Sequence, residues 1–271
     1  MSKSIELLSR YIQERFPVRI FLPLALFLSV AGLSGGRSVE GIGFTMTFCL
    51  ASLLVFQFRL GDDLADRRRD WLEHPERVLP SARSTTPFHL LLILAMTGNL
   101  VLIVLQDGPQ YPLFVFLILN GGLLLWYRWL RHFLSRPAVH YHVVLIKYPV
   151  FVYLLSGPSS QERGLLLLVS VLVYFTFCVF EALHDAKFYR PTLLALEMSA
   201  LGLTSCLMVV LTLQRGLIPA LFLGTLALGG ILILVSLYRC LRNHLHSGNL
   251  SYGVFVIGFL QILVFTLGDG S

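Results

Sequence analysis

The sequence predicts an all-α protein, a polytopic membrane bundle of nine transmembrane helices with its N-terminus in the cytoplasm and its C-terminus outside. Three observations support this fold class. Residues of types AVILMFWYC make up 56% of the 271 positions, and only 13% are charged, against about 25% in soluble domains. Long apolar stretches recur along the chain, and the segments that connect them are alternately rich and poor in Lys and Arg. An ordinary soluble globule and a disordered chain are therefore both disfavoured.

The apolar stretches define the spans in order. A transmembrane helix needs about 20 residues, and the Leu-rich runs lack the alternation that membrane strands show. The predicted spans are 18–34, 42–60, 88–105, 111–130, 142–156, 164–181, 192–213, 217–238 and 250–267. The first and the fifth are short or interrupted, by Pro23 and Pro149.

Residues 1–17 precede the first span and carry apolar side chains between cations, which predicts a short interfacial helix. They are not expected to act as a signal peptide, because no small-residue cleavage site follows a short apolar core. The rest of the chain, 18–271, is predicted to be a single transmembrane domain.

The cations set the expected orientation. Of the 21 Lys and Arg residues, all but Arg37, Arg163 and Arg215 fall on the side of the N-terminus, which the positive-inside rule places in the cytoplasm. The two long loops, 61–87 and 128–141, lie on that side, so the active site is expected to face the cytoplasm. If the source is bacterial, the membrane is expected to be the inner or plasma membrane. Topology thus accounts for the net charge of +6, and neither nucleic acid nor an obligate protein partner is expected.

An acidic run follows the second span. Six of the 15 acidic residues lie between Asp62 and Glu76. On a continuing helix Asp63, Asp66 and Asp70 share a face, and Asp62 and Asp66 are neighbours at i, i+4. Like charges at this spacing repel unless a cation lies between them, and carboxylates suit Mg²⁺. The plain alternative is a solvated acidic turn balanced by the arginines at 67–69.

A second acidic pair, Glu181 and Asp185, lies at i, i+4 at the cytoplasmic end of the sixth span. Two facing carboxylate sets, each holding Mg²⁺, would clamp a diphosphate while an allylic C–O bond ionises. A central cavity opening near the cytoplasmic side would receive an isoprenoid chain and keep water from the cation.

The run Asp62-Asp63-Leu-Ala-Asp66-Arg-Arg-Arg-Asp70, with the segment 74–81 that follows it, resembles the first aspartate-rich motif of the UbiA superfamily of intramembrane prenyltransferases. The resemblance implies that these four aspartates hold Mg²⁺ and, through it, the diphosphate. It also implies that Glu181 and Asp185 occupy the first two acidic positions of the second motif.

This chain departs from the family pattern at both motifs. Glu181 replaces an Asp, and Tyr189 stands where some members carry a third acid. In the first motif Asp62 replaces Asn, and in its continuation Val78 and Ala82 replace Pro and Gly. The departures indicate a divergent member.

Further residues complete the predicted site. Three cations are candidates for diphosphate binding, namely Arg77, Lys147 and Lys187. The plainer alternative is that Arg77 and Lys187 only mark the cytoplasmic side, and that the Lys147 side chain extends to the membrane interface. Asn120 is a candidate cavity residue, against an interhelical hydrogen bond. The ring faces of three tyrosines could stabilise a carbocation, although most aromatic residues simply pack. They are Tyr127, Tyr148 and Tyr174.

Other polar and sulfur-bearing residues receive plainer interpretations. Glu197, early in the seventh span, is expected to close a polar network. The four cysteines show no metal-ligand spacing and are interpreted as small apolar residues. They are Cys49, Cys178, Cys206 and Cys240.

The predicted function is the Mg²⁺-dependent transfer of a prenyl group from an isoprenoid diphosphate to a lipophilic acceptor, in the first place an aromatic one, as in terpenoid or quinone biosynthesis. The same metal site without an acceptor would make the chain a UbiA-type terpene cyclase. A non-catalytic membrane protein that binds lipid is the alternative from a different class.

Overall fold

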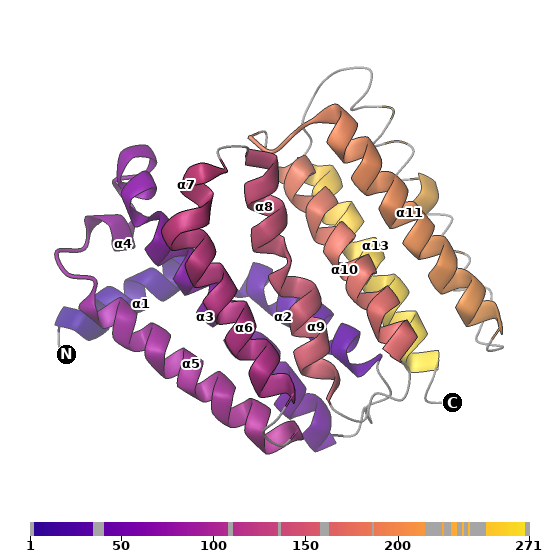
Figure 1. The fold of residues 1–271 in the computed structure, drawn as a ribbon, viewed down its shortest axis with the longest axis horizontal. Coiled ribbons are helices and arrows are strands. Elements are labelled where there is room, and N and C mark those ends of the chain that lie inside the picture. The colour runs from indigo at the N-terminus through magenta and orange to yellow at the C-terminus, as the bar shows by residue number, and fades with distance from the viewer. Residues whose placement is uncertain are drawn as a thin grey trace. The chain divides into compact units, whose positions relative to one another are not determined.

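The computed structural model describes residues 3–34, 41–107, 111–134, 137–157, 163–185, 187–214, 248–268 and isolated positions between 224 and 238. All regular elements of these residues are helices (Figure 1). They are α1 (Lys3–Arg15), α2 (Val18–Leu33), α3 (Gly41–Glu73), α4 (Val78–Ser81), α5 (Thr86–Asp107), α6 (Tyr111–Leu125), a π-helical turn (Trp126–Leu130), α7 (Arg131–Phe133), α8 (Pro137–Leu145), α9 (Lys147–Ser156), α10 (Arg163–His184), α11 (Pro191–Gln214) and α13 (Gly248–Gly268).

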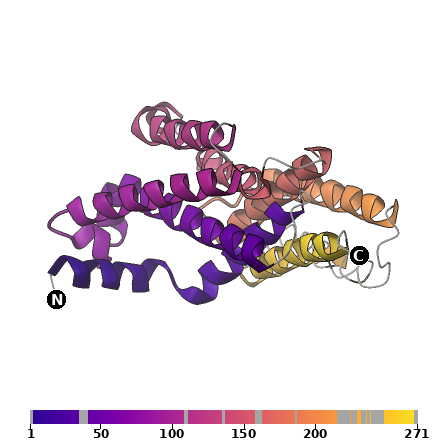
Figure 2. The same cartoon turned by 90° about the horizontal axis from the view of Figure 1, so that it is seen from below.

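Seven of the described helical stretches are long and apolar enough to cross a membrane, which makes the chain a multi-pass integral membrane protein. An eighth candidate is the pair α1 and α2, bent by 71°, and Figure 2 shows this change of direction. The predicted span at 217–238 lies largely outside the described residues. The count of nine spans, the orientation and the central cavity therefore stay predictions.

Pro17 accounts for the break between α1 and α2. A proline has no N–H to donate and disfavours helical backbone at the residue before it. Its carbonyl instead accepts the first bonds of α2, from the N–H groups of Ile20 at 2.9 Å and Phe21 at 3.1 Å. The break leaves α1 as a separate short helix, and its interfacial position stays a prediction.

Helix α3 continues well past its apolar part. Its 33 residues span about 50 Å at 1.5 Å per residue, whereas the hydrocarbon core of a bilayer is about 30 Å thick. The final turns, which contain the acidic run, therefore extend beyond the length that the hydrocarbon needs.

The chain divides into two compact units, and each is described by itself. The first comprises Met1–Ser29 and Glu40–Arg128, and the second comprises Val30–Val39 and Trp129–Ser271. The prediction of a single domain over 18–271 stays a prediction.

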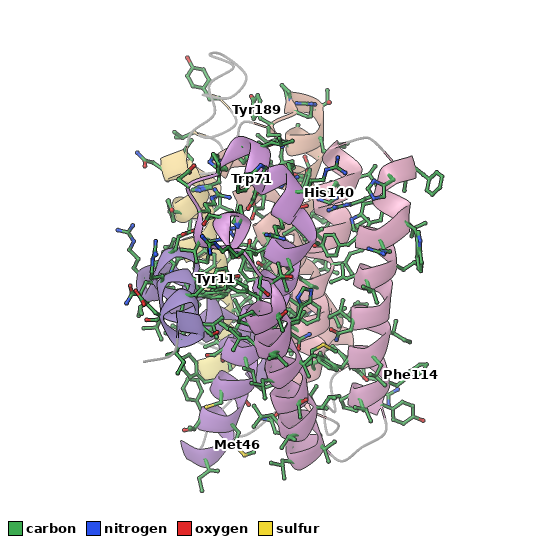
Figure 3. The ribbon with its side chains drawn as sticks, turned by 90° about the vertical axis from the view of Figure 1, so that its left-hand side faces the viewer. Tyr11, Met46, Trp71, Phe114, His140 and Tyr189 are labelled. Atoms are coloured by element: carbon green, nitrogen blue, oxygen red, sulfur yellow. The ribbon has the colours of Figure 1, made fainter. Side chains whose placement is uncertain are left out.

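The first unit is organised around α3, which packs along α5. At the end with the acidic run, Tyr11 of α1 is fully buried against α3, α4 and α5 (Figure 3). Deeper along α3, an amide chain joins three helices. Asn99 donates to Gln57 at 2.8 Å, and Gln57 donates to Asn120 at 2.7 Å. These bonds pair amide groups that would otherwise be costly in hydrocarbon, although the buried Oδ1 of Asn99 has no hydrogen-bond partner among the described residues.

Helix α10 forms the centre of the second unit and packs against α8, α9, α11 and α13. Small residues allow close packing here. A Cβ added at Gly258 of α13 would lie 2.8 Å from the Thr176 hydroxyl of α10, a distance below van der Waals contact. Large side chains are thereby excluded from this crossing.

Candidate functional site

The four aspartates of the acidic run lie on one uninterrupted helix but in different surroundings. Asp63 and Asp70, two turns apart, are buried, with 5% and 7% of their surface exposed. Asp62 and Asp66, one turn apart, are only half-buried. The run is therefore divided into a buried pair and a more accessible pair.

Asp63 binds the N-terminal helix through both of its carboxylate oxygens. Arg15 donates to Oδ1 at 2.5 Å and to Oδ2 at 2.9 Å, a bidentate pair, and the Tyr11 hydroxyl donates to Oδ2 at 2.9 Å. Arg59, one turn before Asp63 on α3, lies 3.4 Å from Oδ1. Burial, and to a smaller extent the negative charge of nearby Asp63, raises the pKa of Tyr11 far above its ordinary value. The Tyr11 hydroxyl therefore keeps its proton and remains a hydrogen-bond donor.

Asp70 and the segment after α3 form a second set of contacts. Arg77 donates to Asp70 at 3.0 Å, so a predicted diphosphate ligand and a predicted metal ligand lie together. The Val78 N–H donates to Glu14 of α1 at 2.9 Å, and Arg67 donates to the Ala82 carbonyl at 2.8 Å. The continuation of the motif is thus folded back against α1 and α3.

Asp62 and Asp66 fit the donor set that Mg²⁺ prefers. The ion is usually held by one or two carboxylates together with waters and substrate phosphates, and two carboxylates one helical turn apart supply that set. Asp62 accepts the Tyr127 hydroxyl, and Asp66 accepts from exposed Arg69 at 3.0 Å. Asp63 fits less well, because Arg15 and Tyr11 already bind both of its oxygens.

The second acidic pair lies at the end of α10, in the second unit. Glu181 and Asp185 are half-buried, one helical turn apart. The Asp185 carboxylate accepts the backbone N–H of Lys187 at 2.9 Å, which closes the turn after the helix. The Lys187 side chain itself is exposed.

Lys147 is buried, whereas the two predicted tyrosines of this unit, Tyr148 and Tyr174, are half-buried. Lys147, only 6% exposed, has its Nζ 5.6 Å from the centre of the Tyr148 ring, within the range of a cation–π contact. Tyr148 stacks on Phe177 with ring centres 3.9 Å apart. The Tyr174 hydroxyl lies 2.9 Å from His142 Nδ1.

Sequence reasoning did not identify several of the residues that shape these surroundings. They are Tyr11, Arg15, Gln57 and His142. Gln57 could have been found, because it is a polar residue in the middle of an apolar span. No local pattern pairs Arg15 with Asp63, since 48 positions separate them.

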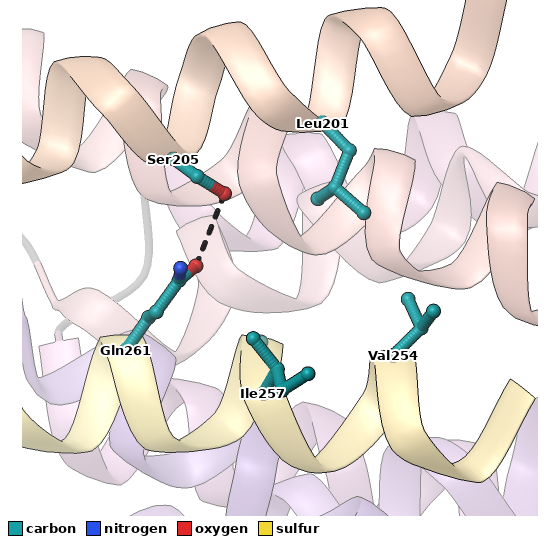
Figure 4. A pocket seen from close by; sticks show the side chains of 6 residues that line it. Leu201, Ser205, Val254, Ile257 and Gln261 are labelled. Atoms are coloured by element: carbon teal, nitrogen blue, oxygen red, sulfur yellow. Dashed lines mark hydrogen bonds between the residues drawn. The ribbon is translucent and has the colours of Figure 1, made fainter. Parts of the chain in front are cut away.

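A small cavity lies between α11 and α13 of the second unit (Figure 4). Ser205 donates to Gln261 across it at 3.1 Å, and Leu201, Val254 and Ile257 complete its wall. Its volume of about 10 Å³ corresponds to roughly one water molecule. This cavity is too small to hold a prenyl chain.

Comparison with known proteins gives a match of structure alone. No family model matches the chain, and no curated protein matches it in sequence. A structure described as that of digeranylgeranylglyceryl phosphate synthase in membranes matches with a TM-score of 0.65 and 15% identity, covering 97% of this chain and 98% of the other. A UbiA homologue from Aeropyrum pernix K1 matches with a TM-score of 0.61 and 14% identity, covering 93% and 98%. The resemblance that the aspartate-rich motif predicts is thus confirmed in the fold, and the chain has the fold of a UbiA-type membrane protein.

Proposed function

We propose that this chain is a Mg²⁺-dependent membrane prenyltransferase, which transfers the prenyl group of an isoprenoid diphosphate to a lipophilic acceptor. The observation that carries the proposal is the acidic run on α3. The chain has a UbiA-type fold. Its helix α3 extends past its apolar part and presents Asp62 and Asp66 one turn apart. Glu181 and Asp185 at the end of α10 supply a second pair with the same spacing.

The residues take distinct roles in this proposal. Asp62, Asp66, Glu181 and Asp185 hold Mg²⁺, which when bound neutralises the diphosphate as the C–O bond breaks. Arg77, Lys147 and Lys187 bind the remaining diphosphate oxygens.

Asp63 and Asp70 act mainly by positioning. Asp63 holds α1 against α3 through Arg15, and Asp70 places Arg77 near the other aspartates of the run. Asn120, Tyr127, Tyr148 and Tyr174 are proposed to line the surface that receives the isoprenoid chain. The active site is proposed to face the cytoplasm, on the side of the Lys- and Arg-rich loops.

A diphosphate-release assay tests the proposal. The purified chain in detergent is given donors from C5 to C20 and longer, with Mg²⁺ or with EDTA. Acceptors are aromatic compounds and, because one structural neighbour is described as a digeranylgeranylglyceryl phosphate synthase, glyceryl phosphate ethers. We expect Mg²⁺-dependent release that increases with an acceptor. Release of a terpene from the donor alone would assign the cyclase activity instead, and no release with any donor would favour a non-catalytic lipid-binding protein.

Two substitutions test the residues. Asp66→Asn and Asp185→Asn are expected to lower turnover at least 100-fold, because each removes a charge from a metal pair. Glu73→Gln is the matched control, since it removes a charge from the exposed end of the same helix α3 and should leave turnover within twofold. Full activity in both aspartate variants would contradict the metal site.

A further inference from the structure

A second group of possible metal ligands lies in the second unit, apart from the acidic motifs. His142 of α8, Cys178 of α10 and Glu197 of α11 each offer one ligand atom, and these atoms lie within 4.8 Å of one another. Cys178 and Glu197 are 0% and 2% exposed. Three helices therefore bring a thiol, an imidazole and a carboxylate to one buried point.

One distance within the group already suits a tetrahedral ion. Cys178 Sγ lies 3.5 Å from His142 Nδ1. Around zinc, with Zn–S of about 2.3 Å and Zn–N of about 2.0 Å, the sulfur and nitrogen ligands of a tetrahedron also lie about 3.5 Å apart. His142 faces Cys178 with Nδ1 and Glu197 with Nε2, and the three ligand atoms lie within 4.8 Å of one another. Binding of one ion therefore requires the side chains to turn until Cys178 and Glu197 approach the same ring nitrogen.

Glu197 gives a separate indication of a missing partner. Its Oε1 accepts the Tyr141 hydroxyl and lies 3.1 Å from His142 Nε2. Its Oε2 is buried, and no group of the described residues hydrogen-bonds to it. A buried carboxylate oxygen without a donor is costly, and a bound cation would satisfy it.

The charges of the group also balance around a divalent cation. A Cys178 thiolate and the Glu197 carboxylate carry two negative charges, and a neutral His142 adds none. A divalent ion makes the set neutral, which removes the large cost of isolated charges inside an apolar bundle. Thiolate and imidazole ligands favour zinc over magnesium.

We propose that Cys178, His142 and Glu197 form a binding site for one Zn²⁺ ion that links α8, α10 and α11. The Tyr174 hydroxyl, 2.9 Å from His142, or a water molecule completes the coordination. Cys178 lies three residues before Glu181 on α10, so the ion would brace the helix that presents the second acidic pair. This proposal would give Cys178 a role beyond that of a small apolar residue.

Cobalt titration tests this site without any turnover. The full chain, stripped of metal with a chelator and held in detergent, is titrated with Co²⁺ as a spectroscopic substitute for zinc. We expect one equivalent to produce a thiolate-to-cobalt charge-transfer band, and Zn²⁺ to displace it. Cobalt at the aspartate run would give no such band, so failure of this site and failure of the proposed transferase are distinguishable.

Matched variants identify the ligands. Cys178→Ser should abolish the band, and Glu197→Gln should weaken Co²⁺ binding at least 10-fold. Cys206→Ser, which changes an exposed cysteine of α11, should leave both unchanged. If the wild-type chain gives no charge-transfer band, or if the band persists in Cys178→Ser, the site is refuted and His142 and Glu197 are only hydrogen-bonding partners.

Discussion

Asp63 receives a bidentate pair of hydrogen bonds from Arg15 and a further bond from Tyr11, so a residue of the aspartate-rich motif anchors the N-terminal helix. The side chains of the pair are only 14% and 7% exposed. Breaking a buried ion pair leaves an uncompensated charge, and such losses typically cost about 3–5 kcal/mol. The resemblance of the motif to the UbiA pattern predicts that Asp63 is a metal ligand, whereas the contacts of Asp63 with Arg15 and Tyr11 give it a structural role.

A substitution at Arg15 tests this anchoring. Arg15→Met should lower the free energy of unfolding by about 3 kcal/mol, because the Asp63 charge stays buried without its bidentate partner. Thermal unfolding of the purified chain in detergent measures the loss. Arg69→Met is the control, since its pair with Asp66 involves a 46% exposed guanidinium and should contribute less than about 1 kcal/mol. Equal stability of the two variants would mean that α1 is not held by this pair.

Among the elements, close helix packing distinguishes the second unit. A Cβ added at Gly32, near the end of α2, would lie 3.0 Å from the backbone carbonyl carbon of Leu155 in α9. Backbone atoms cannot rotate away as side chains do, so a methyl group there must push the two helices apart. This packing constrains α9, the helix that begins with Lys147.

Gly32→Ala should therefore destabilise the chain by about 1–3 kcal/mol, the usual cost of overpacking. Gly202→Ala on α11 is the matched control, because a Cβ there meets nothing within 4 Å. The greater helix propensity of alanine should leave that variant unchanged or slightly more stable. Comparing the thermal midpoints of the two variants measures the difference. A stable Gly32→Ala chain would show that α2 and α9 pack less closely than described.

At the scale of the whole molecule, the distribution of Lys and Arg predicts how the chain is oriented in the membrane. Chemical labelling can measure this orientation. Ser84 lies in the predicted cytoplasmic loop, shortly before α5 begins. Tyr111 is the first residue of α6, shortly after the other end of α5. Both positions are exposed. Each is changed to Cys in a chain whose four native cysteines are Ser.

An impermeant thiol reagent should label Tyr111→Cys in intact cells and Ser84→Cys only after permeabilisation. The reverse pattern would overturn the predicted orientation and, with it, a cytoplasmic active site. The permeabilised cells act as the control for reactivity, because both positions should then be labelled.

The sequence by itself determined the features that depend on local order. Hydropathy and helical period located the spans of the described helices, because a helix in hydrocarbon satisfies its own backbone bonds and needs only sufficient apolar length. The same period placed Asp62 and Asp66 one turn apart, and it placed Glu181 and Asp185 likewise.

Only the tertiary structure decided which partner each polar side chain has. The bond between Arg15 and Asp63 joins residues 48 positions apart, and that between Tyr141 and Glu197 joins residues 56 apart. The group of His142, Cys178 and Glu197 requires three helices to meet. No period in the sequence encodes such contacts, because they depend on how helices cross and rotate against one another. The sequence therefore determined where the acidic groups stand along their helices, and packing determined which of them are buried in ion pairs.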